Sequence, residues 1–178
     1  MKEYYLIIFL ISLIFISACG EESSTNDQSN TNTQPSSSNT NIKIYKIGDK
    51  FTLNKITYTV NKVDKLDFIG NEFLNKQPDG IFYIISLTVE NTDNKAREYF
   101  SPEFKIVDSK NREFTDDREA TLYLKTSGYE PIFFEQLQPS LPKQGAVAFD
   151  LPTDANGLKL KIKDGMFSSE EVIIDLDL

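Results

Sequence analysis

The sequence contains no histidine and only one cysteine, Cys19. Without histidine, the Ser-His-Asp and Cys-His forms of nucleophilic catalysis lack their base. Zinc sites built from histidine and cysteine are excluded for the same reason, and no disulfide can form within the chain. No other pattern of residues indicates an enzyme, so the sequence predicts no catalytic residues, no metal site and no cofactor.

Positive charge is also scarce, because 19 Lys and Arg face 27 Asp and Glu and give a net charge of -8. A negative field of this kind repels phosphate backbones, which argues against nucleic acid as a partner. The length of 178 residues suits one domain with tails. The 13 Phe and 8 Tyr supply enough apolar material for a core.

The N-terminus carries a short apolar run, residues 4–16, after the positive charge of Lys2. A bilayer span needs about twenty apolar residues, so this shorter run, followed by small residues, fits a secretory signal. The sequence ISAC at 16–19 resembles the bacterial lipobox, whose cysteine becomes the lipidated first residue of the mature chain. We therefore predict a lipoprotein signal peptide at 1–18 and lipidation of Cys19; an ordinary signal with a chance cysteine, or an uncleaved anchor, are the alternatives.

The lipobox resemblance also implies how the protein is held at the membrane. By that resemblance the cysteine carries at least two acyl chains, which is enough for stable anchoring. Residues 21–41 (EESSTNDQSNTNTQPSSSNTN) then contain no aliphatic and no aromatic side chain. Such a segment cannot bury enough apolar area to offset its ordering entropy. We interpret 19–41 as the lipidated cysteine followed by a disordered tether, and 42–178 as the folded domain.

From Ile42 onward the sequence alternates between apolar and polar residues, which is typical of half-buried β-strands. The apolar sets are Ile56, Tyr58 and Val60; Tyr83, Ile85, Leu87 and Val89; Phe104 and Ile106; Val147, Phe149 and Leu151; Leu158, Leu160 and Ile162; and Val172, Ile174 and Leu176. Phe82 and Ile84 alternate with the second set and are also apolar, so both faces of this strand carry apolar residues near its start. This predicts a central strand that is covered on both faces at its start. Residues 116–126 fit either a short helix or a strand.

Short strands separated by turn signals predict an all-β fold, an immunoglobulin-like antiparallel β-sandwich preceded by the tether. Four blocks, at 47–63, 80–99, 104–114 and 146–162, resemble the bacterial domain of unknown function 4352. That resemblance implies a sandwich also found in a secreted mycobacterial immunoprotective antigen, and it brings no catalytic residues. Family members often carry Pro-Gly before the fourth block, where this chain has LPKQG at 141–145, so the turn geometry there is open.

The aromatic segment around Tyr123, Tyr129, Phe133 and Phe134 is the most unusual part of the domain, because strand alternation does not place all four rings inward. Beside Gly128 and Pro131 these rings could form a binding surface. They could instead plug one end of the sandwich, and this second interpretation is favoured. The hypothesis kept for testing is that Tyr123 or Tyr129 is exposed and contacts a partner.

Three charged groups have a functional and a simpler interpretation. A calcium site could be formed by the acids Asp116, Asp117 and Glu119, with Asp108 and Glu113 nearby. The spacing of these acids does not match an EF-hand loop, so a solvated loop is favoured. Asp175 and Asp177 could act as a pair of carboxylates in acid–base catalysis, or they could form the solvent-exposed face of the last strand. Lys159, Lys161 and Lys163 could contact anionic wall polymers, or keep an exposed sheet face soluble.

These observations favour a non-enzymatic binding or protein-interaction module of the cell envelope. The lipid on Cys19 would hold it at the outer face of the cell membrane, and its partner would be an envelope protein or a wall polymer. The alternative is a carboxylate-based hydrolase of envelope glycans, which needs two acids across a cleft.

Overall fold

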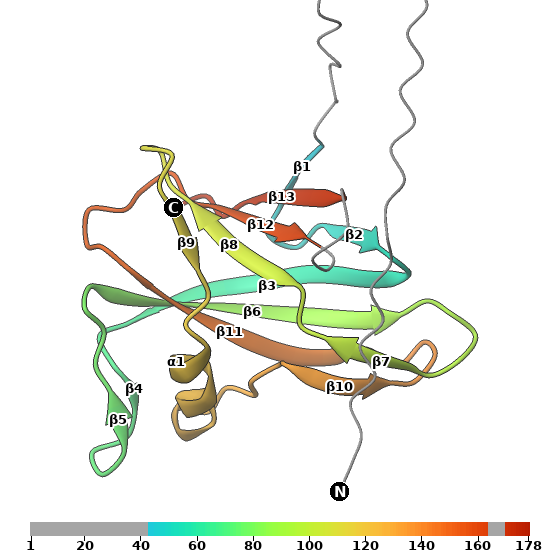
Figure 1. Ribbon diagram of the computed structural model, residues 1–178, viewed down its shortest axis with the longest axis horizontal. Coiled ribbons are helices and arrows are strands. Elements are labelled where there is room, and N and C mark those ends of the chain that lie inside the picture. Colours follow the sequence, from blue (N-terminus) through green and yellow to red (C-terminus); the bar gives the residue numbers. More distant parts are fainter. Residues whose placement is uncertain (1–42, 164–169) are drawn as a thin grey trace, which may run out of the picture. The chain divides into compact units, whose positions relative to one another are not determined.

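The computed structural model describes residues 43–163 and 170–178, which form two facing β-sheets, two small ribbons and a short helical segment (Figure 1). The predicted signal peptide, the lipidation site Cys19 and the tether at 21–41 all lie outside the described residues. Within the described part, no helix is long and apolar enough to cross a membrane.

The first sheet has four strands in the order β11-β6-β3-β2. Their bounds are β2 Lys50–Leu53, β3 Ile56–Leu66, β6 Ile81–Asn91 and β11 Lys143–Leu151. The second sheet has five strands in the order β1-β13-β12-β8-β9. Their bounds are β1 Ile44–Lys46, β8 Glu103–Val107, β9 Glu113–Thr115, β12 Lys159–Lys163 and β13 Glu171–Asp175.

Two antiparallel ribbons and a helical segment complete the described domain. The ribbons are β7 Arg97–Phe100 with β10 Phe134–Leu137, and β4 Ile69–Gly70 with β5 Asn75–Lys76. The helical segment consists of α1, Arg118–Tyr123, and a 3₁₀ turn, η1, Leu124–Ser127. All described strand pairs are antiparallel except β1 with β13, which run parallel. The predicted antiparallel sandwich is therefore confirmed, with one parallel edge strand.

The main core lies between the two sheets and is built by the alternating sets that the sequence predicts. Leu87 is 1% exposed and sits on β6, which has β11 on one side and β3 on the other. The other buried residues of its set are Tyr83, Ile85 and Val89, and they pack with Phe104, Ile106, Leu160, Ile162 and Ile174 of the second sheet. The prediction that β6 is a central strand with this face buried is confirmed.

An extra residue in β3 changes which face its side chains occupy. Val60 pairs with Leu87 and Lys62 with Ser86, so Asn61 is bulged out of the register. Because side chains alternate along a strand, one extra residue shifts every later side chain to the opposite face. Val63 consequently joins the core, whereas Lys62 and Asp64 point to the outer face.

A second, smaller cluster covers one end of the outer face of the four-stranded sheet. It joins Phe82 and Ile84 of β6 to Ala146 and Ala148 of β11, and to Ile69, Ala120 and Leu124. The two-sided burial expected at this end of β6 is therefore confirmed. The cover is the helical segment, which settles residues 116–126 as mainly helix rather than strand.

The helix forms here because its first turn is capped and its inner face is apolar. The Asp117 side chain accepts a hydrogen bond from the Ala120 amide at 2.8 Å, which satisfies one of the free donors of the first turn. Thr121 ties the helix to the sheet, because its hydroxyl accepts from the Ala148 amide at 3.0 Å. Gly128 ends the segment at φ +82°, a left-handed conformation that favours glycine.

Candidate functional site

The structure divides the four aromatic residues that the sequence singled out into two groups. Tyr123 and Tyr129 are half-buried and pack against the outer cluster beneath the helical segment. Phe133 is half-buried, and Phe134 is 55% exposed at the start of β10. The rings therefore form neither one continuous surface nor one plug. Neither tyrosine is fully exposed, and Phe134 is the most exposed of these four residues.

Phe134 forms an exposed aromatic pair with Phe100, which is 68% exposed. The two residues are opposite each other in the β7–β10 ribbon, with ring centroids 4.9 Å apart and planes inclined at 51°. Strand alternation explains their position, because Tyr99 and Leu137 of the same ribbon face the core. We call Phe100 and Phe134 the aromatic pair. Sequence analysis missed Phe100 because its pairing with residue 134 depends on a long-range register.

A hollow of about 230 Å³ lies beside the aromatic pair and adds charged groups to it. Its lining includes Phe133, Asp116 and Arg118. Burial raises the pKa of the Asp116 carboxyl, and the nearby Arg118 guanidinium opposes that rise. Arg118 is largely exposed, with its Nε 3.6 Å from Asp116 Oδ2. This surface thus combines phenylalanine rings with an exposed arginine, residue types that are enriched at protein–protein interfaces.

A larger hollow, of about 490 Å³, lies on the outer face of the four-stranded sheet beside Tyr129. The Tyr129 hydroxyl donates to Asp64 Oδ2 at 3.0 Å. Burial and this hydrogen bond raise the pKa of Tyr129. Lys62 Nζ lies 5.4 Å from the centre of the Tyr129 ring and 2.6 Å from Asp64 Oδ2. We call this hollow the Tyr129 groove.

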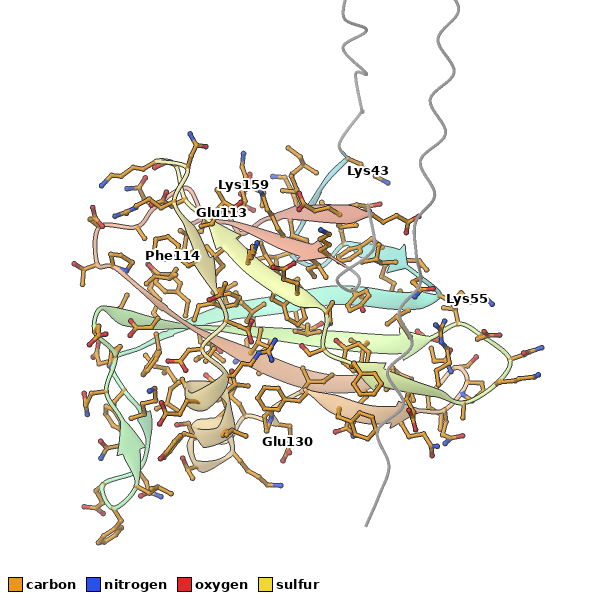
Figure 2. All side chains as sticks on the ribbon, viewed as in Figure 1. Lys43, Lys55, Glu113, Phe114, Glu130 and Lys159 are labelled. Atoms are coloured by element: carbon orange, nitrogen blue, oxygen red, sulfur yellow. The ribbon has the colours of Figure 1, made fainter. Side chains whose placement is uncertain are left out.

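Both surfaces lie on the side of the domain away from its first described residues. In Figure 1, β1 and β13 lie above the four-stranded sheet, whereas α1 and the β7–β10 ribbon lie below it. Figure 2 shows the same separation in labelled residues, with Lys43 at the top and Glu130, which lines the Tyr129 groove, at the bottom. Lys43, the first described residue, therefore lies beside the five-stranded sheet, opposite both surfaces.

The acidic residues considered as a calcium site are used for structure instead of converging. Asp117 caps α1, and Glu119 pairs with Lys76 Nζ at 2.8 Å. Asp108 is buried and its carboxylate accepts from Arg112 Nε at 2.7 Å. Within residues 43–163 and 170–178, no three or more acidic, His or Cys side chains are grouped so as to hold a metal ion. The solvated loop expected for these acids is therefore not what the structure shows, because Asp117 and Glu119 belong to the capped start of α1 and Asp108 is buried.

The lysine row of β12 is interleaved with glutamates. Lys161 Nζ lies 3.0 Å from Glu113 Oε1, and Lys163 stands in register between Glu103 and Glu171. Lys105, on the neighbouring strand β8, pairs with Glu103 at 3.0 Å. This face carries mixed charge instead of the basic stripe that an anionic polymer would need.

The two acids near the C-terminus do not form the alternating pair that the sequence suggested. Strand β13 ends at Asp175, and Asp177 lies beyond it with φ +52°. The Asp177 amide donates to Asp175 Oδ1 at 3.0 Å, and Asp177 Oδ1 lies 3.7 Å from Lys46 Nζ. The expectation of two carboxylates on one strand is therefore wrong, because only Asp175 belongs to β13 and Asp177 lies in a left-handed conformation beyond its end.

Residues 45–172 match the family model described as Domain of unknown function (DUF4352). The chain belongs to this family. The four blocks that resembled DUF4352 all lie within the matched residues, and together they contain most of strands β2, β3, β6, β8, β11 and β12. The departure at 141–145 leaves the DUF4352 fold intact, since β11 begins at Lys143 after a turn with Ser140 at φ +57°.

The DUF4352 domain is similar in sequence to the Bacillus subtilis (strain 168) protein YxkC, with 27% identity over 118 residues. The match covers 64% of this chain and 66% of YxkC, just under two thirds of that relative. Its fold is similar to the yjhA protein of Bacillus subtilis (TM-score 0.55, 19% identity, 75% of this chain and 99% of that one). It is also similar to MPT63, a secreted protein from Mycobacterium tuberculosis (TM-score 0.56, 13% identity, 75% and 97%). Both likenesses agree with the predicted β-sandwich.

Proposed function

We propose that this protein is an extracytoplasmic lipoprotein whose DUF4352 domain is a non-enzymatic binding module for another protein of the cell envelope. Support for the location comes from the apolar run at 4–16 and the ISAC sequence that ends at Cys19. The description of the fold neighbour MPT63 as a secreted protein is consistent with that location. The lipid on Cys19 would be the contact with the membrane.

The observation that carries the binding role is the aromatic pair. Phe100 and Phe134 leave 68% and 55% of their area in water, although Tyr99, the neighbouring ring on the same ribbon, is buried. Removing apolar area from water is favourable by about 25 cal/mol per Å². A partner that covered these two adjacent exposed rings would therefore gain binding free energy. Arg118 beside them adds a charged group that can pair with an acidic partner residue.

The position of the pair supports the same role. The chain enters the described domain at Lys43, on the side of the five-stranded sheet, whereas α1 and the β7–β10 ribbon lie on the opposite side. A rigid sandwich that carries exposed rings on the side away from its first described residue is suited to contact other molecules.

A hydrolase of envelope glycans receives less support from the two hollows described above. Such an enzyme needs two carboxylates on opposite sides of a cleft, about 5–9.5 Å apart. Asp116 is the one carboxylate among the residues that line the hollow beside the aromatic pair. Glu130 is likewise the one carboxylate among the residues that line the Tyr129 groove. Neither hollow offers the pair of acids that the reaction requires.

Site-specific photo-crosslinking in intact cells tests the proposal. A photoreactive benzoyl-phenylalanine would replace Phe100 or Phe134 in the full-length protein, and Leu122 in a matched control. Leu122 is 65% exposed but lies on α1, outside the lining of the hollow beside the pair. We expect a discrete protein adduct at positions 100 and 134 and none at 122. No adduct at either phenylalanine, or the same adducts at all three positions, would reject the aromatic pair as a partner surface.

A further inference from the structure

We propose that the Tyr129 groove binds an uncharged oligosaccharide. This inference goes beyond the protein-binding role of the aromatic pair, because it concerns a different surface and a different class of ligand. It rests on the shape of the groove, on the polar groups that line it and on the balance of its charges.

The groove exists because the helical segment covers only part of the outer face of the four-stranded sheet. The covered end carries Phe82 and Ile84, which are buried under Ala120 and Leu124. Beyond Ile84 the outward residues of β6 become polar, and the helical cover stops at Gly128. The edge of the cover therefore forms one wall and the polar sheet forms the floor. Its volume of about 490 Å³ is within the usual range for small-ligand sites.

The floor carries hydroxyl and amide groups, which both donate and accept hydrogen bonds. Asn61, which bulges out of β3, hydrogen-bonds Thr88 at 2.9 Å. Ser86 and Gln144 lie in the same lining, on the adjacent strands β6 and β11. Among the described residues, neither the Ser86 hydroxyl nor the Gln144 amide has a hydrogen-bond partner. These two groups are therefore available to a ligand without breaking a contact within the domain.

The two charged residues that line the groove, Lys62 and Glu130, are opposite in sign, and each is paired with a residue beside the groove, although the chain as a whole carries -8. Lys62 Nζ is 2.6 Å from Asp64 Oδ2, and Lys125 Nζ is 3.6 Å from Glu130 Oε2. An anionic ligand would approach Asp64 and Glu130, and a cationic ligand would have to compete with Lys62. The electrostatic complement of this surface is consequently a ligand with no net charge.

The groove combines the Tyr129 ring with several hydroxyl and amide groups. Among uncharged ligands, sugars match this combination best. A sugar ring has hydroxyl groups around its edge, each a donor and an acceptor, which match Ser86, Asn61 and Gln144. Its C–H groups form an apolar face that can pack on the Tyr129 ring. Because the floor is an open sheet, several sugar units can lie along it, so an oligosaccharide fits better than a single sugar.

Saturation-transfer difference NMR on the full-length mature protein tests this inference. The protein would be kept in a detergent without a sugar headgroup, and the probes are the tetrasaccharides of β-1,4-linked glucose and of β-1,4-linked N-acetylglucosamine. We expect saturation transfer to at least one probe, with unchanged intensity when the salt concentration is raised, because no charge on the ligand is screened. No transfer to either probe at millimolar concentration would overturn the proposal.

Three variants locate the binding. Gln144→Ala removes an exposed amide of the floor and should weaken binding about fivefold, as expected for one hydrogen bond to an uncharged group. Gln77→Ala removes an exposed amide outside the groove and should leave binding unchanged. Tyr129→Leu should also weaken binding, and its melting temperature shows whether the fold survives. Binding that is equal in the Gln144→Ala, Gln77→Ala and unmodified proteins would mean that the sugar binds elsewhere, and would overturn the assignment.

Discussion

Ile132 packs directly against the backbone of Gly145, so that its Cβ atom lies 2.4 Å from the position that a Cβ on residue 145 would occupy. Gly145 belongs to β11 and stands opposite Leu87 of the central strand. Ile132 is 1% exposed and belongs to the main core. The absence of a side chain at residue 145 is therefore what lets the segment before β10 close over the edge of the sheet.

The first prediction follows from this contact. Gly145→Ala would force Ile132 and its backbone to move, and overpacking of this kind costs about 1–3 kcal/mol. Gln144→Ala, one residue earlier and exposed, is the matched control and should change the free energy of unfolding by less than about 0.5 kcal/mol. Chemical denaturation measures both. Equal stability of the two variants would show that Ile132 does not press on this strand.

Leu87 provides the second prediction, which tests the position of the central strand. Leu87→Ala removes a side chain that is 1% exposed between the two sheets, and the resulting cavity should cost about 2–5 kcal/mol. Ser86→Ala, on the outer face of the same strand, should cost less than about 0.5 kcal/mol. If the two variants unfolded at the same denaturant concentration, the inward and outward faces of β6 would be wrongly assigned.

The alternation of apolar residues was enough to predict the sandwich and most of its core. It places Leu87, Phe149 and Leu160 inward, and all three are at most 1% exposed. It did not predict the bulge at Asn61, because a bulge depends on how two strands pair and not on either strand alone. It also left 116–126 open, because the helix there is only six residues long and depends on its cap at Asp117 and its packing on the sheet.

The candidate surfaces were less predictable than the core for a related reason. The sequence could single out Phe134, because strand alternation does not assign its ring to the core. Its neighbour Phe100, however, is 34 residues earlier in the sequence. Their contact comes from the register of β7 with β10. The Tyr129 groove likewise depends on where the helical cover ends, which no local pattern specifies.

The third prediction concerns acid stability and centres on Asp154. Hydrogen bonds from Lys110 and Arg112 lower the pKa of its carboxyl from 3.8 to about 2. Because the folded state favours the ionised form, this contribution is present above the unfolded pKa and is lost as the pH falls through the folded value. Asp154→Asn should therefore flatten the decline of the melting temperature between about pH 4 and pH 2.

The control for this measurement is Glu72→Gln, which alters an exposed carboxylate outside the Lys110–Arg112 network. Its melting temperature should follow that of the unmodified protein across the same pH range. An Asp154→Asn protein that lost stability on acidification as steeply as the unmodified protein would show that these ion pairs do not contribute.

The fourth prediction is that residues 21–41 are dispensable for folding. They contain no aliphatic or aromatic side chain that could join a core. Deleting them should change the free energy of unfolding by less than about 0.5 kcal/mol. A longer deletion that also removes β1, Ile44–Lys46, should be destabilising, because β1 pairs with β13 at the edge of the second sheet. A comparable loss of stability in both deletions would count against a tether.

The central claim, a lipid-anchored domain outside the cytoplasm, is tested most directly by the mass of the mature N-terminus. The protein would be extracted from membranes, digested and examined by mass spectrometry, with Cys19→Ala as the control. We predict an N-terminal peptide that begins at Cys19 and carries at least two acyl chains, and a Cys19→Ala protein that is either released from the membrane or left unprocessed. A membrane-bound protein that retains residues 1–18, or one with an unmodified Cys19 thiol, would contradict the account.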